Sequence, residues 1–238
     1  MAPDPGARER AVAELLDRWP WELGGVIIGG YAIAAYGKPR YSTDIDVVIK
    51  IEAFEALDKW LLSEGFTRGP IPEDLEQNYA GKGFQYVREN VTIDVLPGVV
   101  RDREAGVNVP ERWITKDALT TRLFLLESAT KTEVPVCRLE AFVALKIQAG
   151  REKDLSDLFV LRDEKINAKE IQEMFQSLRT STLEAKLRLV LKRLDDEKIF
   201  NDSMARLGLN RRGKLDRGAE WAKFKAKMRA IIEPILTA

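Results

Sequence analysis

The spacing of hydrophobic and polar positions changes along the chain, and the change predicts two kinds of structure. In the first half, short apolar runs alternate with turn residues, whereas from about residue 138 apolar residues recur at helical spacing. We therefore predict an α/β (α+β) domain with a mixed sheet and flanking helices at residues 1–135. An all-helical domain is expected at residues 136–238, with the boundary near Pro135.

The same pattern predicts individual elements. The expected helices of the first half are residues 7–19, 31–36 and 52–63. The expected strands are residues 26–28, 43–49, 84–88 and 91–95. The last two strands form a β-hairpin, because Glu89-Asn90 suits a tight turn between alternating runs. The expected helices of the second half are residues 138–162, 168–178, 182–195 and 217–236.

Composition narrows the possible chemistry. The chain has 238 residues, 45% hydrophobic and 32% charged, which is typical of a soluble globular protein. No apolar run approaches the roughly 18 residues of a membrane span, and the N-terminal stretch lacks the order of a secretion signal, so a cytoplasmic protein is expected. Cys137 is the single cysteine and histidine is absent from the sequence. Serine–histidine and cysteine–histidine catalysis, histidine-bound zinc and thiolate zinc clusters are thereby excluded.

Three aspartates stand out on segments that are otherwise suited to burial. In "IIGGYAIAAYGKPRYSTDIDVVI", residues 27–49, Asp44 and Asp46 share one face of a strand, and Asp94 lies on a later strand. Carboxylates about 4 Å apart repel by roughly 4 kcal/mol per pair at an effective dielectric constant of about 20. Mg²⁺ favours carboxylate oxygens together with substrate phosphates. We therefore predict that the three aspartates bind a metal ion if their strands are neighbours.

The glycines before these aspartates fit a phosphate site. Gly29 and Gly30 follow a strand and enter a helix, which lets backbone amides approach a phosphate closely. Arg40, Ser42 and Thr43 lie just before the aspartates and are candidates for contacts with phosphate oxygens. Each motif alone is common in ordinary turns and strand ends, so the prediction depends on their ordered combination.

This ordered combination resembles the signature of the DNA-polymerase-β-like nucleotidyltransferase superfamily. The resemblance covers roughly residues 26–97, and "TIDVLPG" supplies the third acid as Asp94. It implies transfer of a nucleoside monophosphate from a nucleoside triphosphate, such as ATP, with release of pyrophosphate. It also implies Mg²⁺, as two ions, with Mn²⁺ as a possible substitute. Asp44 and Asp46 would bind metal, and Asp94 would complete a second metal site or act as the base.

A second resemblance concerns "VCRLEAFVALKIQAGREKDLSDLFVL", residues 136–161. It is similar to the helix after the core in small bacterial and archaeal nucleotidyltransferases, including abortive-infection toxins of toxin–antitoxin pairs. The resemblance implies that Lys146 touches the triphosphate and that Lys153 and Asp154 belong to the site, with Asp157 as the rival acid. Lys146 also falls on an apolar helical face, where its ammonium needs an anion or must reach solvent. A structural pair of Lys153 with Asp157 explains those two residues almost as well.

The acceptor is open at the level of sequence. The first hypothesis is an RNA end, above all a tRNA 3′ terminus, because residues 201–238 carry nine Lys and Arg against four Asp and Glu. A solvated helical surface explains this charge about equally well. The alternatives are modification of a lincosamide or aminoglycoside antibiotic, nucleotidylation of a protein, and a catalytically inactive nucleotide-binding protein. A toxin would also imply a cognate antitoxin protein as partner.

Overall fold

The computed structural model describes residues 5–69, 83–102, 106–207 and 216–237. The chain divides into two compact units, one of Met1–Arg103 with Asn108–Arg138 and the other of Glu104–Val107 with Leu139–Ala238. The longer segment of the second unit begins at Leu139, and the domain boundary near Pro135 stays a prediction. Among the described residues, no helix is both long enough and apolar enough to cross a lipid bilayer.

The first unit is built on a mixed seven-stranded sheet in the order β3-β4-β5-β2-β1-β9-β8. Strands β2 and β5 are parallel, as are β1 and β9, and the other pairs are antiparallel. The strands of this sheet are β1 (Val26–Ile28), β2 (Asp44–Ile49), β3 (Thr67–Arg68), β4 (Phe84–Arg88), β5 (Val91–Pro97), β8 (Leu119–Thr121) and β9 (Val134–Val136). A two-stranded sheet pairs β6 (Val99–Asp102) with β7 (Val107–Pro110).

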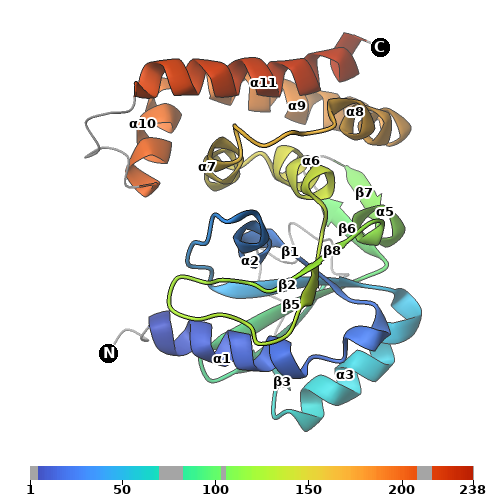
Figure 1. Cartoon of the computed structure of the whole chain (residues 1–238). Coiled ribbons are helices and arrows are strands. Elements are labelled where there is room, and N and C mark those ends of the chain that lie inside the picture. The colour runs from blue at the N-terminus through green and yellow to red at the C-terminus, as the bar shows by residue number, and fades with distance from the viewer. Residues whose placement is uncertain (1–4, 70–82, 103–105, 208–215, 238) are drawn as a thin grey trace. The chain divides into compact units, whose positions relative to one another are not determined.

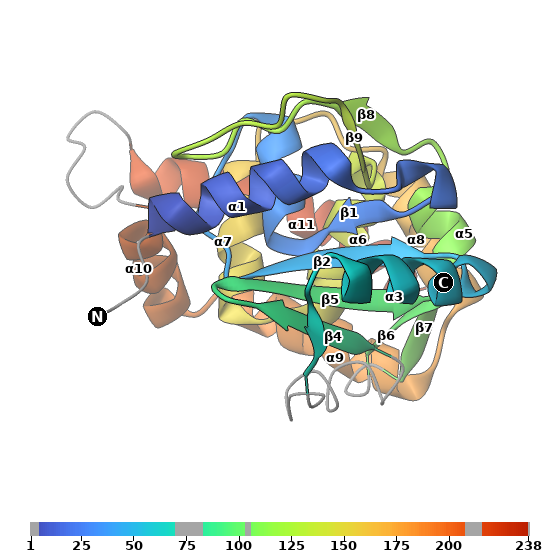
Figure 2. The same cartoon turned by 90° about the horizontal axis from the view of Figure 1, so that it is seen from below.

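Helices α1 (Pro5–Arg18) and α3 (Phe54–Ser63) cover one face of the large sheet (Figures 1 and 2). Strand β2 alternates, so that Ile45 and Val47 are fully buried while Asp44 and Asp46 are only partly covered. The helix after β1 consists of α2 (Gly29–Ala32) and a 3₁₀ turn (Ile33–Tyr36), with a second short helix α5 (Glu111–Thr115) after β7. Alternation along the start of β2 therefore places Ile45 and Val47 on one face, in the core, and Asp44 and Asp46 on the opposite face.

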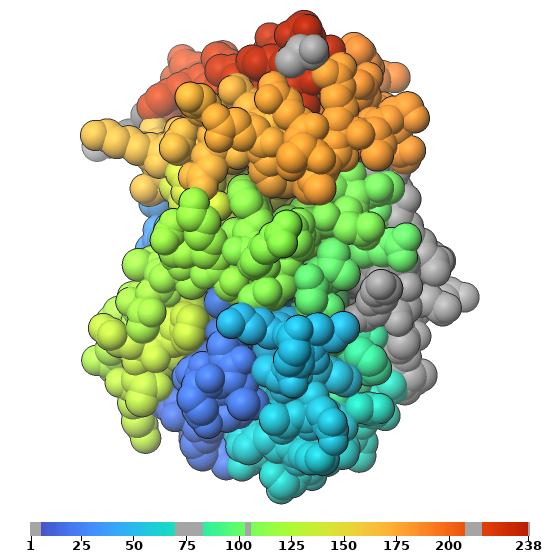
Figure 3. Space-filling view, turned by 90° about the vertical axis from the view of Figure 1, so that its right-hand side faces the viewer, coloured from blue at the N-terminus to red at the C-terminus, as the bar shows by residue number. Residues whose placement is uncertain are grey.

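The second unit is helical, with α11 packed against α8 and α9. In the space-filling view of Figure 3, the surface atoms of the later part of this unit are orange and red. Trp221 and Phe224 of α11 contact Phe159 of α7 and form the aromatic part of its core. Its helices are α6 (Leu139–Ala149), α7 (Glu152–Val160), α8 (Ala168–Ser177), α9 (Ser181–Leu194), α10 (Glu197–Arg206) and α11 (Arg217–Thr237).

The predicted strands β1, β2, β4 and β5 are confirmed, one predicted helix is divided in two, and several elements were not predicted: strands β3 and β6 to β9 and the helices α5 and α10. The single helix expected over residues 138–162 is two helices, because Gly150 adopts a left-handed φ of 56° and ends α6. The helix α10 was not expected; it begins at the N-cap Asp196, whose side chain accepts a hydrogen bond from the Lys198 amide. The predicted fold class, a mixed α/β sheet followed by a helical region, is confirmed.

Candidate active site

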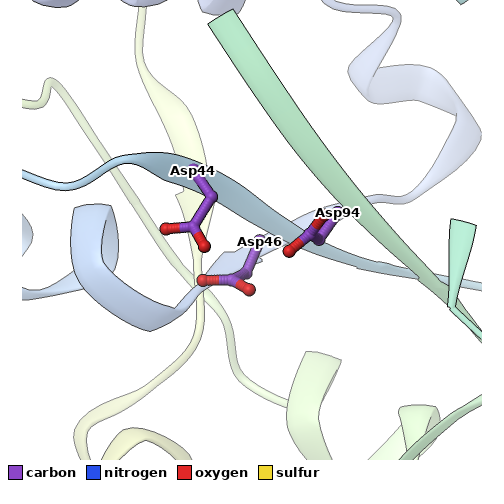
Figure 4. Close-up of side chains that lie close together, drawn as sticks. All are labelled: Asp44, Asp46 and Asp94. Carbon is purple, nitrogen blue, oxygen red and sulfur yellow. The ribbon is translucent and has the colours of Figure 1, made fainter. Parts of the chain in front are cut away.

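Three carboxylates meet at the centre of the first unit's sheet. The parallel register of β2 and β5 pairs Asp46 with Asp94, and Asp44 lies two residues earlier on the same face. One ligand oxygen from each residue lies within 4.8 Å of the other two. Figure 4 shows the three side chains pointing toward one another from the two strands. The strand pairing on which the sequence prediction depended is thus present.

Neutral donors contact two of these carboxylates. The hydroxyl groups of Ser42 and Thr43 each donate to Asp44 Oδ1 at 3.2 Å. On the other side of the site, the Gln85 amide donates to Asp94 Oδ1 at 2.9 Å. Asp94 is 3% exposed, so this hydrogen bond replaces water that the carboxylate has lost. Hydrogen bonds from uncharged groups fix a carboxylate without cancelling its charge.

Two adjacent glycines let the backbone approach these side chains. A Cβ atom at Gly29 would lie 1.8 Å from Asp46 Oδ2, and Gly29 has a left-handed φ of 65°. A Cβ atom at Gly30 would lie 2.1 Å from Ser42 Oγ and 3.2 Å from an Arg40 guanidinium nitrogen. No side chain larger than hydrogen fits at either position without moving these groups. The Gly-Gly pair therefore has a steric function in the site as well as a conformational one.

The segment from Arg40 to Thr43 is held by a buried tyrosine. The Tyr31 hydroxyl donates to the Ser42 carbonyl oxygen at 3.3 Å. Burial, with a smaller effect from the Glu9 carboxylate, raises the pKa of Tyr31 to about 12, so the phenol stays protonated and able to donate. Arg40 brings its guanidinium to Gly30 and donates to the Tyr41 carbonyl oxygen at 2.9 Å. One cation thus lies beside the acidic group.

The donor set fits a hard divalent cation. All the side-chain ligands are carboxylate oxygens, which Mg²⁺ prefers, and they lie close enough to share one or two ions. Three negative charges within 4.8 Å repel one another by about 3 kcal/mol per pair at an effective dielectric constant of about 20. When the positive charge of Arg40 is added to the three carboxylates, the formal charge of the group is −2. Asp44, Asp46 and Asp94 are therefore the residues that would hold the metal.

The other predicted site residues belong to the second unit. Lys146 Nζ lies 2.9 Å from Asp154 Oδ1 and 2.7 Å from Asp157 Oδ2. Burial alone would lower the pKa of Lys146, but the two carboxylates raise it above its ordinary value. Asp154 is fully buried; burial opposes its ionisation, yet Lys146 and Arg151 lower its pKa to about 2. The role of Lys146 at the triphosphate stays a prediction.

Both rival acids, Asp154 and Asp157, contact Lys146, and the assignment of Asp154 to the site stays a prediction. Arg151 adds a second cation, with Nε 2.7 Å from Asp154 Oδ2. Lys153 is exposed. The structure therefore brings together the predicted residues numbered 29 to 94 in one unit, and pairs Lys146 with Asp154 in the other.

Sequence reasoning missed Gln85 and Tyr31 as members of the site. The position of Gln85 could have been predicted from the hairpin. A two-residue turn at Glu89-Asn90 pairs Arg88 with Val91, and three residues farther along each strand the same register pairs Gln85 with Asp94. Tyr31 carries no comparable signal. Its hydrogen bond to the Ser42 carbonyl oxygen depends on how the helix after β1 packs in three dimensions.

Comparison with known proteins assigns the chain to a family. A sequence profile described as nucleotidyl transferase AbiEii toxin, type IV toxin–antitoxin system, matches residues 13–235. The chain belongs to the AbiEii nucleotidyltransferase toxin family. The resemblance seen in the sequence is thereby confirmed, and the chain is a nucleotidyltransferase. AbiEii membership implies a nucleotide substrate and an antitoxin partner.

Several solved structures are similar to this AbiEii chain at low sequence identity, and one of them, with a TM-score above 0.5, shares its fold. The nucleotidyltransferase toxin MenT4 of Mycobacterium tuberculosis is 16% identical, with a TM-score of 0.54, and the match covers 98% of this chain and 92% of MenT4. JHP933 from Helicobacter pylori is 14% identical, with a TM-score of 0.41 and coverage of 97% and 91%. The antibiotic-resistance factor ANT(2'')-Ia is 16% identical, with a TM-score of 0.37 and coverage of 99% and 100%. No curated protein matches the sequence.

Proposed function

We propose that this AbiEii chain is a magnesium-dependent toxin that transfers a nucleoside monophosphate from a nucleoside triphosphate to the hydroxyl of an RNA end, with a tRNA 3′ terminus as the acceptor. One observation carries the metal-dependent reaction: carboxylates from two neighbouring parallel strands lie within 4.8 Å of one another. Nothing else in the described part of the chain brings three acidic side chains together in this way.

Each acid has a role in this proposal. Asp44 and Asp46 hold Mg²⁺, and Asp94 completes a second ion site or accepts the proton of the acceptor hydroxyl. The acceptor oxygen forms a bond to the α-phosphorus, the bond from that phosphorus to the bridging oxygen breaks, and pyrophosphate leaves. When bound, Mg²⁺ offsets negative charge on the triphosphate and on the leaving pyrophosphate.

The residues before β2 form the phosphate side of the proposed site. Ser42 and Thr43 lie within hydrogen-bond distance of Asp44, and Arg40 brings the positive charge nearest to the Gly29-Gly30 backbone. Because neither glycine has a side chain, a phosphate can approach the backbone amides at this turn. We assign Arg40 to charge neutralisation and Ser42 and Thr43 to hydrogen bonds with phosphate oxygens.

The support for an RNA acceptor is the charge of the C-terminal segment. Residues 201–238 carry a formal charge of +5. Several cations of α11 have local partners, since Lys223 pairs with Asp163 and Lys225 and Arg229 pair with Asp195. Arg211, Arg212 and Lys214, which contribute to this charge, lie outside the described residues.

A labelling experiment separates the possible acceptors. The protein is incubated with each α-labelled nucleoside triphosphate, Mg²⁺ and a lysate, and the label is followed into RNA and protein. Magnesium-dependent label at the 3′ end of tRNA is the expected result. Label in protein, or transfer only to added aminoglycosides or lincosamides, would overturn the RNA acceptor but keep the nucleotidyl transfer. No label and no pyrophosphate with any acceptor would contradict the catalytic proposal itself.

A further inference from the structure

Gln85 lies beside Asp94 on the neighbouring strand, and its position is fixed by the hairpin. The register of β4 and β5 pairs Gln85 with Asp94, between the pairs Phe84–Val95 and Tyr86–Ile93. Tyr86 and Ile93 are fully buried, so the strands cannot slip without exposing core side chains. The Gln85 amide therefore reaches the Asp94 carboxylate from a rigid frame rather than from a loop.

The contact is suited to orienting a carboxylate. Gln85 Nε2 donates to Asp94 Oδ1 at 2.9 Å, which restricts rotation of the carboxylate about its Cβ–Cγ bond. Asp94 is 3% exposed, so solvent gives little help in fixing its orientation. An amide is also uncharged. A lysine or arginine at position 85 would make the same hydrogen bond but would cancel a charge that a cation needs.

We infer that Gln85 is a positioning residue of the nucleotidyl-transfer site, which holds the Asp94 carboxylate in the orientation required for metal binding. This inference rests on the proposed function, because it assigns Asp94 to the metal site. Partners of this kind, which contact the ligand rather than the metal, typically change metal affinity or activity by about 10- to 100-fold when they are removed.

The first test measures Mn²⁺ binding to the full-length protein by electron paramagnetic resonance, without nucleotide. Gln85→Met keeps the size of the side chain and removes the donor, and we expect its Mn²⁺ affinity to fall about 10-fold. Gln85→Asn keeps an amide but shortens the reach, and a similar loss is expected. Gln85→Lys keeps a donor but adds positive charge, so it should bind Mn²⁺ more weakly than Gln85→Met does.

A matched control is available in the second unit. Gln172 is also half-buried and donates through its amide, to the carbonyl oxygens of Ala230 and Ile231. Gln172→Met should leave Mn²⁺ affinity unchanged. In transfer assays, Gln85→Met should need about 10-fold more Mg²⁺ for half-maximal rate and should regain most of the wild-type rate at saturating Mg²⁺.

The outcomes separate this inference from the proposed function. If Gln85→Met and Gln85→Asn bind Mn²⁺ as the wild type does, with only a lower melting temperature, Gln85 is structural and the inference is wrong. If Gln85→Met does not fold, the Mn²⁺ affinity of Gln85→Asn alone decides: weaker binding supports the inference, and wild-type binding contradicts it. If the wild type itself binds no Mn²⁺ with or without nucleotide, the proposed metal site fails, whatever the variants show.

Discussion

The two units each contain a cluster of aspartates, and the clusters differ in how their charge is balanced. Asp44, Asp46 and Asp94 carry three negative charges against the one positive charge of Arg40, and Asp44 accepts hydrogen bonds from two hydroxyl groups and Asp94 one from an amide. In the second unit, the two charges of Asp154 and Asp157 are matched by Lys146 and Arg151. A carboxylate cluster whose negative charge is not balanced attracts a metal cation, whereas a cluster whose charge is balanced by Lys and Arg side chains contributes to the stability of the fold.

This comparison also bears on the prediction for Lys146. An ammonium group that lies within 3 Å of two carboxylates has an electrostatic partner without any substrate. A contact with triphosphate would have to compete with those two ion pairs. The variants below are chosen to show whether the first cluster acts in catalysis and the second in stability.

The largest effect is expected for Asp46→Ala. Removing this carboxylate from the centre of the first cluster should lower nucleotidyl transfer by at least about a thousandfold, because an ion could no longer be held against the substrate. The rate of pyrophosphate release measures the loss, and circular dichroism checks the fold. Glu55→Ala, which removes an exposed acid of α3, should keep full activity. A folded Asp46→Ala protein with near-normal turnover would refute the site.

The next effect concerns stability. Asp154→Asn leaves Lys146 with one carboxylate and removes the negative charge that pairs with Arg151, and removing one member of a buried ion pair typically costs about 3 kcal/mol or more. Urea unfolding at pH 7 measures this change. Asp163→Asn, in the exposed pair with Lys223, should unfold as the wild type does.

The same variant tests the role of the second cluster in catalysis. If the cluster acts only through stability, Asp154→Asn should keep its transfer rate within about tenfold at a temperature where it is folded, since the acids of the first unit are intact. A loss as large as that of Asp46→Ala, without loss of fold, would place Lys146 and Asp154 in the reaction, as the resemblance implies.

Gly29→Ala is expected to have an effect of intermediate size. Its methyl group would lie 1.8 Å from Asp46 Oδ2 and must displace the carboxylate, and a displacement of about 1 Å at a reacting group can cost about 100-fold in rate. Gly37→Ala is the matched control: Gly37 has a similar φ of 69°, but nothing lies within 4 Å of the added Cβ. Both variants carry backbone strain of about 1 kcal/mol.

The difference between the two glycine variants therefore isolates the steric contact with Asp46. Transfer rate and melting temperature are measured for both proteins. Gly29→Ala should lose activity and Mn²⁺ binding, whereas Gly37→Ala should lose only stability. Equal activity in the two variants would mean that the carboxylate has room to move, and the site would not depend on the close approach of the Gly29 backbone.

The sequence predicts those parts of the site that depend on residues close together in the chain, and it does not by itself predict contacts between distant strands. Alternation along β2 placed Asp44 and Asp46 on one face, and the glycine-bounded helix at residues 31–36 was visible in the spacing. Asp46 and Asp94 lie side by side only because β2 pairs with β5. A helix and another strand separate β2 from β5 in the sequence, and strands so separated can be arranged in a sheet in several ways. The resemblance, rather than the pattern itself, supplied that contact.

The second unit was harder to predict for a different physical reason. Gly150 lies inside a run of helical periodicity, and a single glycine is compatible with a continuous helix. The break becomes favourable because the Gly150 carbonyl oxygen accepts a hydrogen bond from Arg193, and Asp154 caps α7 by accepting one from the Arg151 amide. These contacts depend on tertiary packing, which hydrophobic spacing does not encode. The ion pairs of Lys146 and Arg151 with Asp154 and Asp157 join residues on the two sides of this break, so they were not predicted either.

The smallest predicted effect is the pH dependence of the second cluster. The folded-state pKa of Asp154 is about 2, below its ordinary value of 3.8. The unfolded chain therefore binds the proton first as the pH falls, and the stability that Asp154 contributes is complete above about pH 4 and is lost between about pH 4 and 2. The difference between the two pKa values corresponds to about 2 kcal/mol.

Urea unfolding of the wild type and Asp154→Asn at pH 5, 4 and 3 tests this prediction. The difference in unfolding free energy between them should shrink as the pH falls, because asparagine does not titrate and only the wild type loses the contribution. Lys146 does not interfere, since its raised pKa moves its own loss of stability to alkaline pH, above its ordinary value of 10.5. A difference that stays constant from pH 5 to 3 would mean that the Asp154 carboxylate is no more strongly ionised in the folded protein than in the unfolded chain. The ion pairs of the second cluster would then not be a source of its stability, and the contrast with the acidic cluster of the first unit would fail.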